Sequence, residues 1–332
     1  ALWSDYALLA AEQQGARWPR DLDGGRVAAV AVRHHAPRED DAGDWIVAEA
    51  DRLASGLERK QRDEQAEQAG LALREVELAA LMPALDIGRG STSGSQACYH
   101  RAEELSAEAL LPKPGDASGQ PRRYGELWQA WLERHAEIAR HGLSPRRLEQ
   151  ALLGLSERLL WAVPSSTVDQ PDVSLHDHAR AVAAIAACLA AWHRAHGVWE
   201  VATVKDRARP KFRLAALDLS GIQRALFRLS GRGGASRILR ARSFLMGQTV
   251  EAALHRLLER LDLPFSTVLI HAGGKAELLL PDLPELEARL EATRADLDGW
   301  MIGHWQGDLG LVLAWGRAFA ASEFLRKGEQ GE

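Results

Sequence analysis

The spacing of hydrophobic positions changes near residue 200. Before that point Ala, Leu, Glu and Arg dominate and runs of β-branched residues are scarce, which is typical of helices. The clearest helix is predicted over 176–196, where apolar residues recur every three or four positions along one face. Asp177 is predicted to cap its N-terminus. We therefore expect residues 1–200 to be predominantly helical.

After residue 200, short apolar runs alternate with longer periodic segments. A Gly273-Gly274 pair between the second and third runs predicts a hairpin. The resulting order is β-α-β-β-α-β, the ferredoxin-like plan, so we predict an α+β fold in which a helical region (1–200) precedes a palm-like domain (201–325). Two helices should cover one face of a four-stranded antiparallel sheet. The strands are predicted at 213–219, 265–271, 275–281 and 309–315, and the helices at 236–261 and 283–300.

Fold alone does not settle function, because polymerase palms, nucleotidyl cyclases and many RNA-binding domains share this plan. The net charge of the 332 residues is −5, but residues 205–260 carry 13 basic against four acidic side chains. Such a segment indicates either a phosphate-facing surface or a solvated arginine-rich helix. Cys98 and Cys188 are too few for a disulfide framework, which favours a reducing cytoplasm. With no apolar run of about 20 residues, no membrane association is expected.

Histidines beside carboxylates are the first candidate chemistry. His34 and His35 precede Asp51 in the sequence, and imidazole and carboxylate are the ligands of metal-dependent phosphohydrolases. A solvated or structural histidine pair is the alternative. Further along, His176 and Asp177 form an HD dipeptide with His178 beside it, and here a capped helix start with an exposed histidine is the favoured interpretation.

The turn LDLSGIQ at 217–223 is the second candidate. Asp218 ends a predicted strand, and Ser220-Gly221 turns the chain where backbone N–H groups can receive a triphosphate. An ordinary strand-to-helix turn is the alternative. At the hairpin tip the two glycines are followed by Lys275 and Ala276, and a protonated lysine cannot ligate Mg²⁺. We therefore predict that this palm is not the metal-catalytic kind, and that Lys275 either contacts a phosphate or is solvated.

Arginines at the start of the 236–261 helix supply much of the local positive charge. Arg237, Arg240 and Arg242 are predicted to contact phosphate or RNA. Surface arginines without a ligand are the alternative.

These motifs occur in an order that resembles one known family, the large signalling subunit of type III CRISPR interference complexes (the HD/palm polymerase–cyclase family of Csm and Cmr complexes). HHAPREDD and IVAEADRLASGLER look like its HD-type region, DVSLHDH like the approach to the first palm, and LDLSGIQ, LRARSF and AGGKAELLLPD like the core of that palm. The resemblance covers nearly the whole chain.

The resemblance implies a role in antiviral defence. When guide RNA pairs with a foreign transcript, such subunits convert ATP into cyclic oligoadenylate, using Mg²⁺ or Mn²⁺, and many cut single-stranded DNA with a divalent metal in the HD domain. Two palms face each other and hold two ATP molecules, and the second palm carries a Gly-Gly-Asp-Asp motif. The implied partners are the guide RNA, the small-subunit and backbone proteins, target RNA and single-stranded DNA.

Carried over to this sequence, the resemblance implies an ATP site and an HD remnant. The remnant consists of His34, His35 and Asp51. The opening His-Asp of the nuclease is not found before the histidine pair, and no Gly-Gly-Asp-Asp occurs anywhere in the sequence. Truncation, disorder and divergence are the explanations; a fragment is favoured, and we expect that it neither cuts DNA nor makes product by itself. The ATP site is predicted to comprise Asp218, Ser220, Gly221, Ile222, Gln223, Gly273, Gly274 and Lys275.

Two other functions fit parts of the sequence. One is a ferredoxin-like RNA-binding module of a CRISPR ribonucleoprotein without its own chemistry, but strands 214–219 and 276–281 lack the aromatic residues on which bases would stack. The other is a free HD-type phosphohydrolase acting on small nucleotides, which needs a more complete metal shell than His34, His35 and Asp51 provide.

Overall fold

The computed structural model describes residues 23–58, 76–82, 97–115, 121–166, 171–227 and 234–325. The chain divides into two compact units, one of residues 1–38 and 50–182 and the other of residues 39–49 and 183–332. We call them the helical unit and the palm unit. The mixture of helices and antiparallel sheets confirms the predicted α+β class. The functional domain limits at 1–200 and 201–325 remain predictions.

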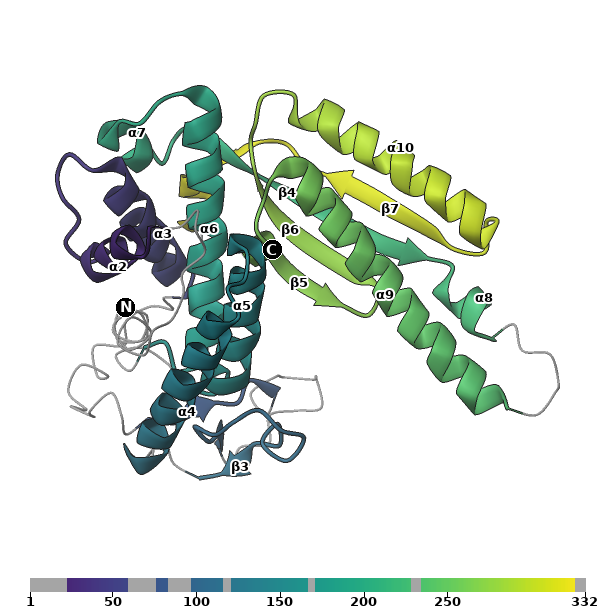
Figure 1. Ribbon diagram of the computed structural model, residues 1–332, viewed down its shortest axis with the longest axis horizontal. Coiled ribbons are helices and arrows are strands. Elements are labelled where there is room, and N and C mark those ends of the chain that lie inside the picture. The colour runs from purple at the N-terminus through teal and green to yellow at the C-terminus, as the bar shows by residue number, and fades with distance from the viewer. Residues whose placement is uncertain are drawn as a thin grey trace, which may run out of the picture. The chain divides into compact units, whose positions relative to one another are not determined.

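Helices make up most of the described part of the helical unit (Figure 1). Tyr124, Leu127 and Trp131 recur at helical spacing and pack with Leu155 and Leu159 in one buried cluster, which is the amphipathic pattern expected of paired helices. These helices are α2 (Gly24–Arg33), α4 (Pro121–Arg140) and α5 (Pro145–Leu160), with the adjoining parts of α3 (Ala42–Glu58) and α6 (Leu175–His196).

A small antiparallel sheet in the helical unit was not predicted from the sequence. Its strands are β1 (Leu78–Ala79), β2 (Cys98–His100) and β3 (Lys113–Pro114), in the order β1-β2-β3. Segments of two or three residues are too short to show the alternation that marks a strand.

Helix α6 begins one residue before the predicted start, and the predicted cap is wrong. Ser174, not Asp177, precedes the helix, and its Oγ accepts a hydrogen bond from the backbone N–H of Asp177 at 3.0 Å. The same hydroxyl donates to Asp177 Oδ2 at 2.7 Å. Asp177 therefore lies inside the first turn, where a carboxylate also interacts favourably with the helix dipole.

The palm unit has the predicted ferredoxin-like topology (Figure 1). Its strands pair antiparallel in the order β5-β6-β4-β7, with β8 added beside β4. The short helices α7 and α8 and the strand β8 were not predicted. The elements are α7 (Val201–Lys205), β4 (Pro210–Ser220), α8 (Ile222–Phe227), α9 (Ala235–Leu261), β5 (Val268–Ala272), β6 (Lys275–Pro281), α10 (Leu286–Trp305), β7 (Gly310–Trp315) and β8 (Phe319–Ala320).

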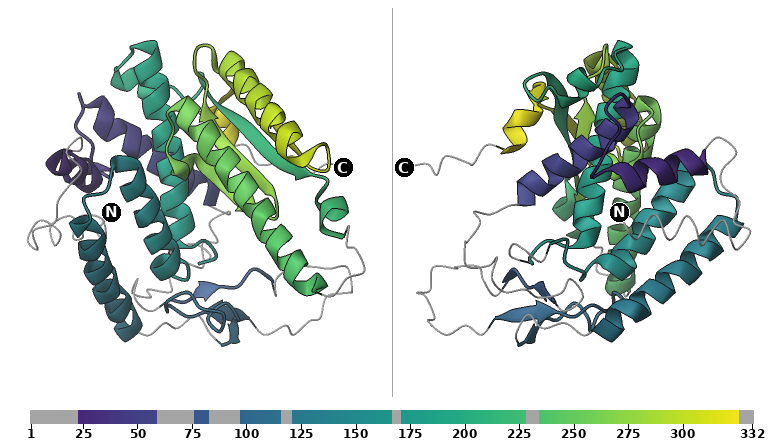
Figure 2. Two further views of the ribbon diagram at one scale, coloured as in Figure 1. Left: turned by 45° about the vertical axis from the view of Figure 1, so that its right-hand side comes forward. Right: turned by 90° about the vertical axis from the view of Figure 1, so that its left-hand side faces the viewer.

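Both long palm helices cover the same face of the sheet, as the turned views in Figure 2 show. Along β4 the side chains alternate, with Ala215, Leu217 and Leu219 buried against α9 and α10, while Leu214 on the other face is 50% exposed. Val312 of β7 is also exposed on that other face, in register with Asp218. One sheet face thus forms the core, and the other is largely open towards the C-terminal end of β4.

Buried charges fix the start of β4. Lys211 is 1% exposed, and its Nζ donates to the backbone carbonyls of Thr203, Val204 and Asp206. Burial lowers the pKa of Lys211 to about 8, so near neutral pH the amine is still mostly protonated and can donate three hydrogen bonds. The ammonium group thereby joins α7 to the first residues of β4.

Leu217 is a sensitive point of the palm core because it is fully buried in the central strand. We expect Leu217→Ala to lower the free energy of unfolding by about 2–5 kcal/mol, since it leaves a cavity. Leu214→Ala, in the same strand but half exposed, should cost less than about 1 kcal/mol. Urea denaturation of both variants measures the difference, and equal losses would contradict the assigned faces of β4.

His135 should make the stability of the chain depend on pH. Burial lowers its pKa, and its Nδ1 has no hydrogen-bond partner among the described residues. Near pH 6.5 and below, His135 therefore takes up a proton in the unfolded chain more readily than in the folded chain. The free energy of unfolding should fall as the pH drops below about 6.5. His135→Phe should reduce this slope by up to about 1.4 kcal/mol per pH unit.

The matched control is His141→Phe, because His141 is exposed just after α4 ends. Denaturant titrations between pH 7.5 and 5.5 compare the two variants with the parent chain. Equal slopes for His135→Phe and the parent would show that His135 becomes protonated without cost in the folded state.

Candidate functional site

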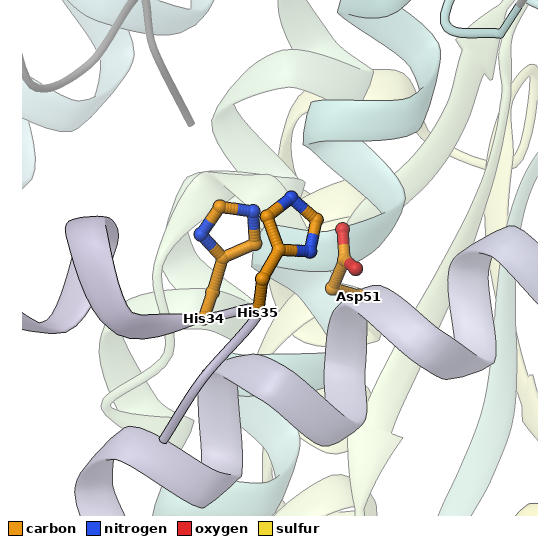
Figure 3. Close-up of side chains that lie close together, drawn as sticks. All are labelled: His34, His35 and Asp51. Atoms are coloured by element: carbon orange, nitrogen blue, oxygen red, sulfur yellow. The ribbon is translucent and has the colours of Figure 1, made fainter. Parts of the chain in front are cut away.

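His34, His35 and Asp51 come together in the helical unit (Figure 3). His34 and His35 follow the last residue of α2, and Asp51 projects from α3. One ligand atom from each side chain lies within 4.8 Å of the others, and the two imidazole centroids are 3.8 Å apart. Among the described residues this is the one group of three or more His, Cys, Asp or Glu side chains that can hold a metal ion.

The hydrogen bond of His34 prepares its ring for ligation. Nδ1 lies 2.6 Å from the carbonyl oxygen of Ala31, and a carbonyl only accepts, so Nδ1 carries the proton and donates it. Nε2 is then left with its lone pair, as a metal ligand requires. Burial lowers the pKa of His34, which keeps the imidazole neutral to lower pH. The side chain is therefore held in the form that binds cations.

Asp51 is oriented by a residue that sequence reasoning did not assign to the site. His178 of α6 has its Nε2 3.2 Å from Asp51 Oδ1. Burial alone would raise the pKa of Asp51, but the hydrogen bond and the charges of His178, His34 and His35 bring that pKa below its ordinary value. The carboxylate thus stays ionised, and the donor set fits a divalent cation. His178 extends the predicted trio as a positioning residue.

His176 and Asp177, the HD dipeptide, face elsewhere. His176 is buried with its Nδ1 2.9 Å from Ser156 Oγ, and Asp177 is engaged by Ser174. The interpretation of these two residues as part of a helix start agrees with the structure, whereas the expectation of an exposed histidine at this start is wrong. The contact of His178 with Asp51 joins positions 127 residues apart, and no local sequence signal could reveal it.

In the palm unit, the end of β4 meets the β5–β6 hairpin. The backbone N–H of Leu219 donates to the carbonyl of Gly274 at 2.8 Å. Gly274 has φ +91°, and a Cβ there would lie 2.7 Å from Ile222 Cδ1. The strand-to-helix turn and the hairpin tip are therefore packed against each other, and the eight residues predicted to bind ATP belong to one region of the surface.

Gly221 has a structural reason to be glycine. Its φ is +86°, and a Cβ would lie 2.4 Å from the carbonyl oxygen of Asp308, so any side chain would displace the loop before β7. Beside it, Ser220 Oγ donates to the carbonyl of Gly310 at 3.1 Å. The fold alone thus sets this turn in its conformation.

Asp218 and Lys275 lie directly opposite each other in the β4–β6 register. Both are on the sheet face turned away from the core, with Lys275 exposed and Asp218 partly exposed. Ala276, the next residue of β6, is buried in the core. The hairpin tip therefore offers one cation next to one carboxylate, which suits a phosphate better than a lone Mg²⁺ ion.

The three predicted phosphate-contacting arginines divide into two kinds. Arg242 Nη1 donates to the carbonyls of Ala225 and Leu226 at 2.8 and 3.4 Å, so this side chain joins α8 to α9. Arg237 and Arg240 are exposed at the start of α9. Phosphate contact remains a prediction for all three, with the exposed pair better placed for it.

Comparison with known proteins gives one consistent result. Residues 211–331 match the family model described as Csm1 subunit domain B. The chain is 32% identical over 285 residues to the CRISPR system single-strand-specific deoxyribonuclease Cas10/Csm1 (subtype III-A) of Thermococcus onnurineus, which covers 86% of the chain and 33% of that relative. The Streptococcus thermophilus protein of the same name is 27% identical over 328 residues, covering 94% of the chain and 42% of that relative.

Solved structures give the same result. A crystal structure of a Csm1–Csm4 cassette in complex with cA4 matches with a TM-score of 0.63 and 28% identity, over 86% of this chain and 34% of that one. A cassette in complex with one ATP matches with a TM-score of 0.63 and 29% identity, over the same shares. The present chain thus spans between about a third and two fifths of the length of these relatives.

The chain joins a helical region that carries a histidine–carboxylate cluster to a domain of ferredoxin-like plan, which is the arrangement expected of the HD/palm class of proteins. Within that class, the chain belongs to the Cas10/Csm1 family, the large subunits of type III CRISPR systems. Among the described helices, none is long and apolar enough to cross a membrane.

The role assigned to His178 can be tested through metal affinity. We expect His178→Ala to weaken Mn²⁺ or Ni²⁺ binding by about 10- to 100-fold, the usual effect of removing a residue that orients a ligand. His178→Gln can still donate to Asp51 and should recover part of the loss. Isothermal titration calorimetry measures the affinities, with the exposed His141→Ala as control. Unchanged binding in His178→Ala would remove this residue from the site.

Proposed function

We propose that the chain is the ATP-binding, non-catalytic palm and part of the HD region of a type III CRISPR large subunit that makes cyclic oligoadenylate from ATP. The observation that carries the proposal is the contact between the β4 turn and the hairpin tip, through Leu219 and Gly274. This contact gathers a hydroxyl, an ammonium group and a close-lying backbone in one place. Related Csm1–Csm4 cassettes crystallised with one ATP, AMPPNP and cA4 support the proposal.

Each group in this region has a definite part in nucleotide binding. The ammonium group of Lys275 offsets phosphate charge, and the Ser220 hydroxyl can rotate its single proton from the Gly310 carbonyl to a phosphate oxygen. The absence of a side chain at Gly221 leaves the backbone accessible. Asp218, opposite Lys275, can hold the ammonium group in place or take part in binding Mg²⁺ or Mn²⁺ with the nucleotide.

Bond formation is assigned to a second palm. The tip of this hairpin carries Lys275 and the buried Ala276, where metal-binding carboxylates would be needed. This palm therefore contributes binding and positioning of one ATP. The chain by itself should bind ATP weakly and form no cyclic product.

We further propose that the His34-His35-Asp51 cluster belongs to the metal site of the HD nuclease, which acts on single-stranded DNA. A divalent metal there would activate water and neutralise phosphate charge. His34 and Asp51 would ligate through Nε2 and a carboxylate oxygen, and His178 would hold the carboxylate in place. Three ligand residues do not form a complete two-metal site, so this chain alone should not cut DNA efficiently.

The proposed partners follow from the same family. A Csm4-like backbone subunit is the first, because the related structures contain Csm1–Csm4 cassettes and a subcomplex of the type III-A interference complex. The small-subunit proteins, guide RNA, target RNA and single-stranded DNA complete the proposal. A plain RNA-binding sheet is less well supported, because the exposed large hydrophobic residues on the open sheet face are aliphatic, such as Leu214 and Val312.

The ATP site can be tested by reversing one charge. Lys275→Glu should weaken ATP binding by about 10- to 150-fold, because one charge-assisted hydrogen bond contributes roughly 1.5–3 kcal/mol. Ser220→Ala should have a smaller effect. Fluorescence titration with an ATP analogue measures both, and Lys113→Glu is the control because Lys113 is an exposed lysine of β3 in the helical unit. Equal affinities in Lys275→Glu and Lys113→Glu would place ATP elsewhere.

Lys275→Glu and Ser220→Ala, made in a complete subunit assembled with its guide RNA complex, separate nucleotide binding from assembly. Cyclic oligoadenylate synthesis should fall sharply while assembly is retained. Normal synthesis in both variants would remove the β4 turn from the ATP site and favour a palm that only binds RNA.

A further inference from the structure

The start of α9 lies outside the palm core. Residues 235–245 contain no buried side chain, and the first residue of α9 that packs into the core is Met246. Figure 1 shows this part of the helix extending beyond the strands, next to α8. We call residues 224–227 of α8, together with residues 234–245, the α8–α9 lobe.

Residues 235–245 lie outside the core, but Ala225 of α8 belongs to the palm core and gives the lobe an anchored side. The guanidinium of Arg242 donates to the carbonyls of Ala225 and Leu226 at the end of α8, and Ala225 is buried. These bonds neutralise part of the negative end of α8 and join the two helices. The side chains that remain exposed are therefore presented on a defined surface.

Two phenylalanines are strongly exposed on this surface. Phe227 is 66% exposed and Phe244 is 70% exposed, and Ile238 and Leu245 of α9 are exposed as well. Large apolar side chains gathered in one exposed region mark an interaction site more often than scattered ones do. Aromatic rings also offer flat faces on which a base can stack.

The charge of the lobe indicates what it binds. Between Asp218 and Glu251 the sequence contains six arginines and no acidic residue, lysine or histidine. Arg224, Arg237 and Arg240 are exposed. Arg237, Arg240 and Phe244 have the spacing i, i+3 and i+7, which places them on one side of α9. The surface therefore combines cations suited to phosphates with an aromatic face.

We propose that the α8–α9 lobe binds single-stranded nucleic acid, with the exposed arginines on consecutive phosphates and Phe244 and Phe227 stacked on bases. Arginine with exposed aromatic rings is the combination that holds single strands without reading their sequence. The lobe is distinct from the proposed ATP turn, and the inference does not depend on ATP binding.

The test uses the full 332-residue chain and fluorescein-labelled 15-mers of uridine and of thymidine, measured by fluorescence anisotropy between 50 and 200 mM salt. Phe244→Ala should weaken binding by about 5- to 150-fold, the loss expected for one stacked base. The double variant Arg237→Ala/Arg240→Ala should reduce the slope of log affinity against log salt by about 1.4, because each phosphate contact contributes roughly 0.7.

Arg256→Ala is the matched control, since Arg256 is an exposed arginine further along α9 and outside the lobe. It should leave the affinity and the salt slope nearly unchanged. Ser220→Ala, which tests the ATP turn, should also bind the oligonucleotides normally, so that the two proposals fail separately. The substituted residues are exposed, and equal thermal unfolding midpoints would show that folding is intact.

Two results would overturn the proposal. One is a parent chain that does not bind either 15-mer at 50 mM salt. The other is binding that Phe244→Ala and the double arginine variant change no more than Arg256→Ala does, because nucleic acid would then bind on another surface.

Discussion

The pairing of β4 with β6 and β7 is the constraint on which the palm depends. The strand is central, and its register places Asp218 opposite Lys275 on one side and Val312 on the other. Because side chains alternate along a strand, a shift of the β4 register by one residue would move Leu217 from the core to the solvent-facing side of the sheet. The hydrophobic core therefore specifies which residues reach the open face, and the proposed nucleotide site inherits its geometry from core packing.

Glycine packing makes the β4 turn a preformed structure. At Gly221 and Gly274 a side chain would collide with Asp308 and Ile222, respectively. Both positions also have positive φ, which glycine adopts at little cost. A turn that is already in its final conformation does not have to be ordered when a ligand binds, which improves affinity for a given set of contacts. The fold therefore requires both glycines whether or not a nucleotide binds.

Buried charges hold the other end of β4, where hydrophobic contacts alone would not fix the chain. Arg207 forms a bidentate pair with Glu49, whose side chain is almost fully buried, and Lys211 binds three carbonyls. Loss of Arg207, whose own side chain is 37% exposed, would leave the buried Glu49 carboxylate without this partner. Charged side chains thus hold the start of β4, and close backbone packing at Gly221 and Gly274 holds its end.

The sequence by itself determined the order of palm elements, because strands of period two and helices of period 3.6 leave different patterns between residues 210 and 315. It also supplied the types of residue at both candidate sites. Tertiary structure decided which of them act together. His178 reaches Asp51 across 127 residues, Ser174 replaces Asp177 as the cap of α6, and Arg242 is committed to α8 rather than exposed. The local pattern of apolar residues predicts whether a segment is a helix or a strand, whereas the partner of a side chain depends on how distant segments pack.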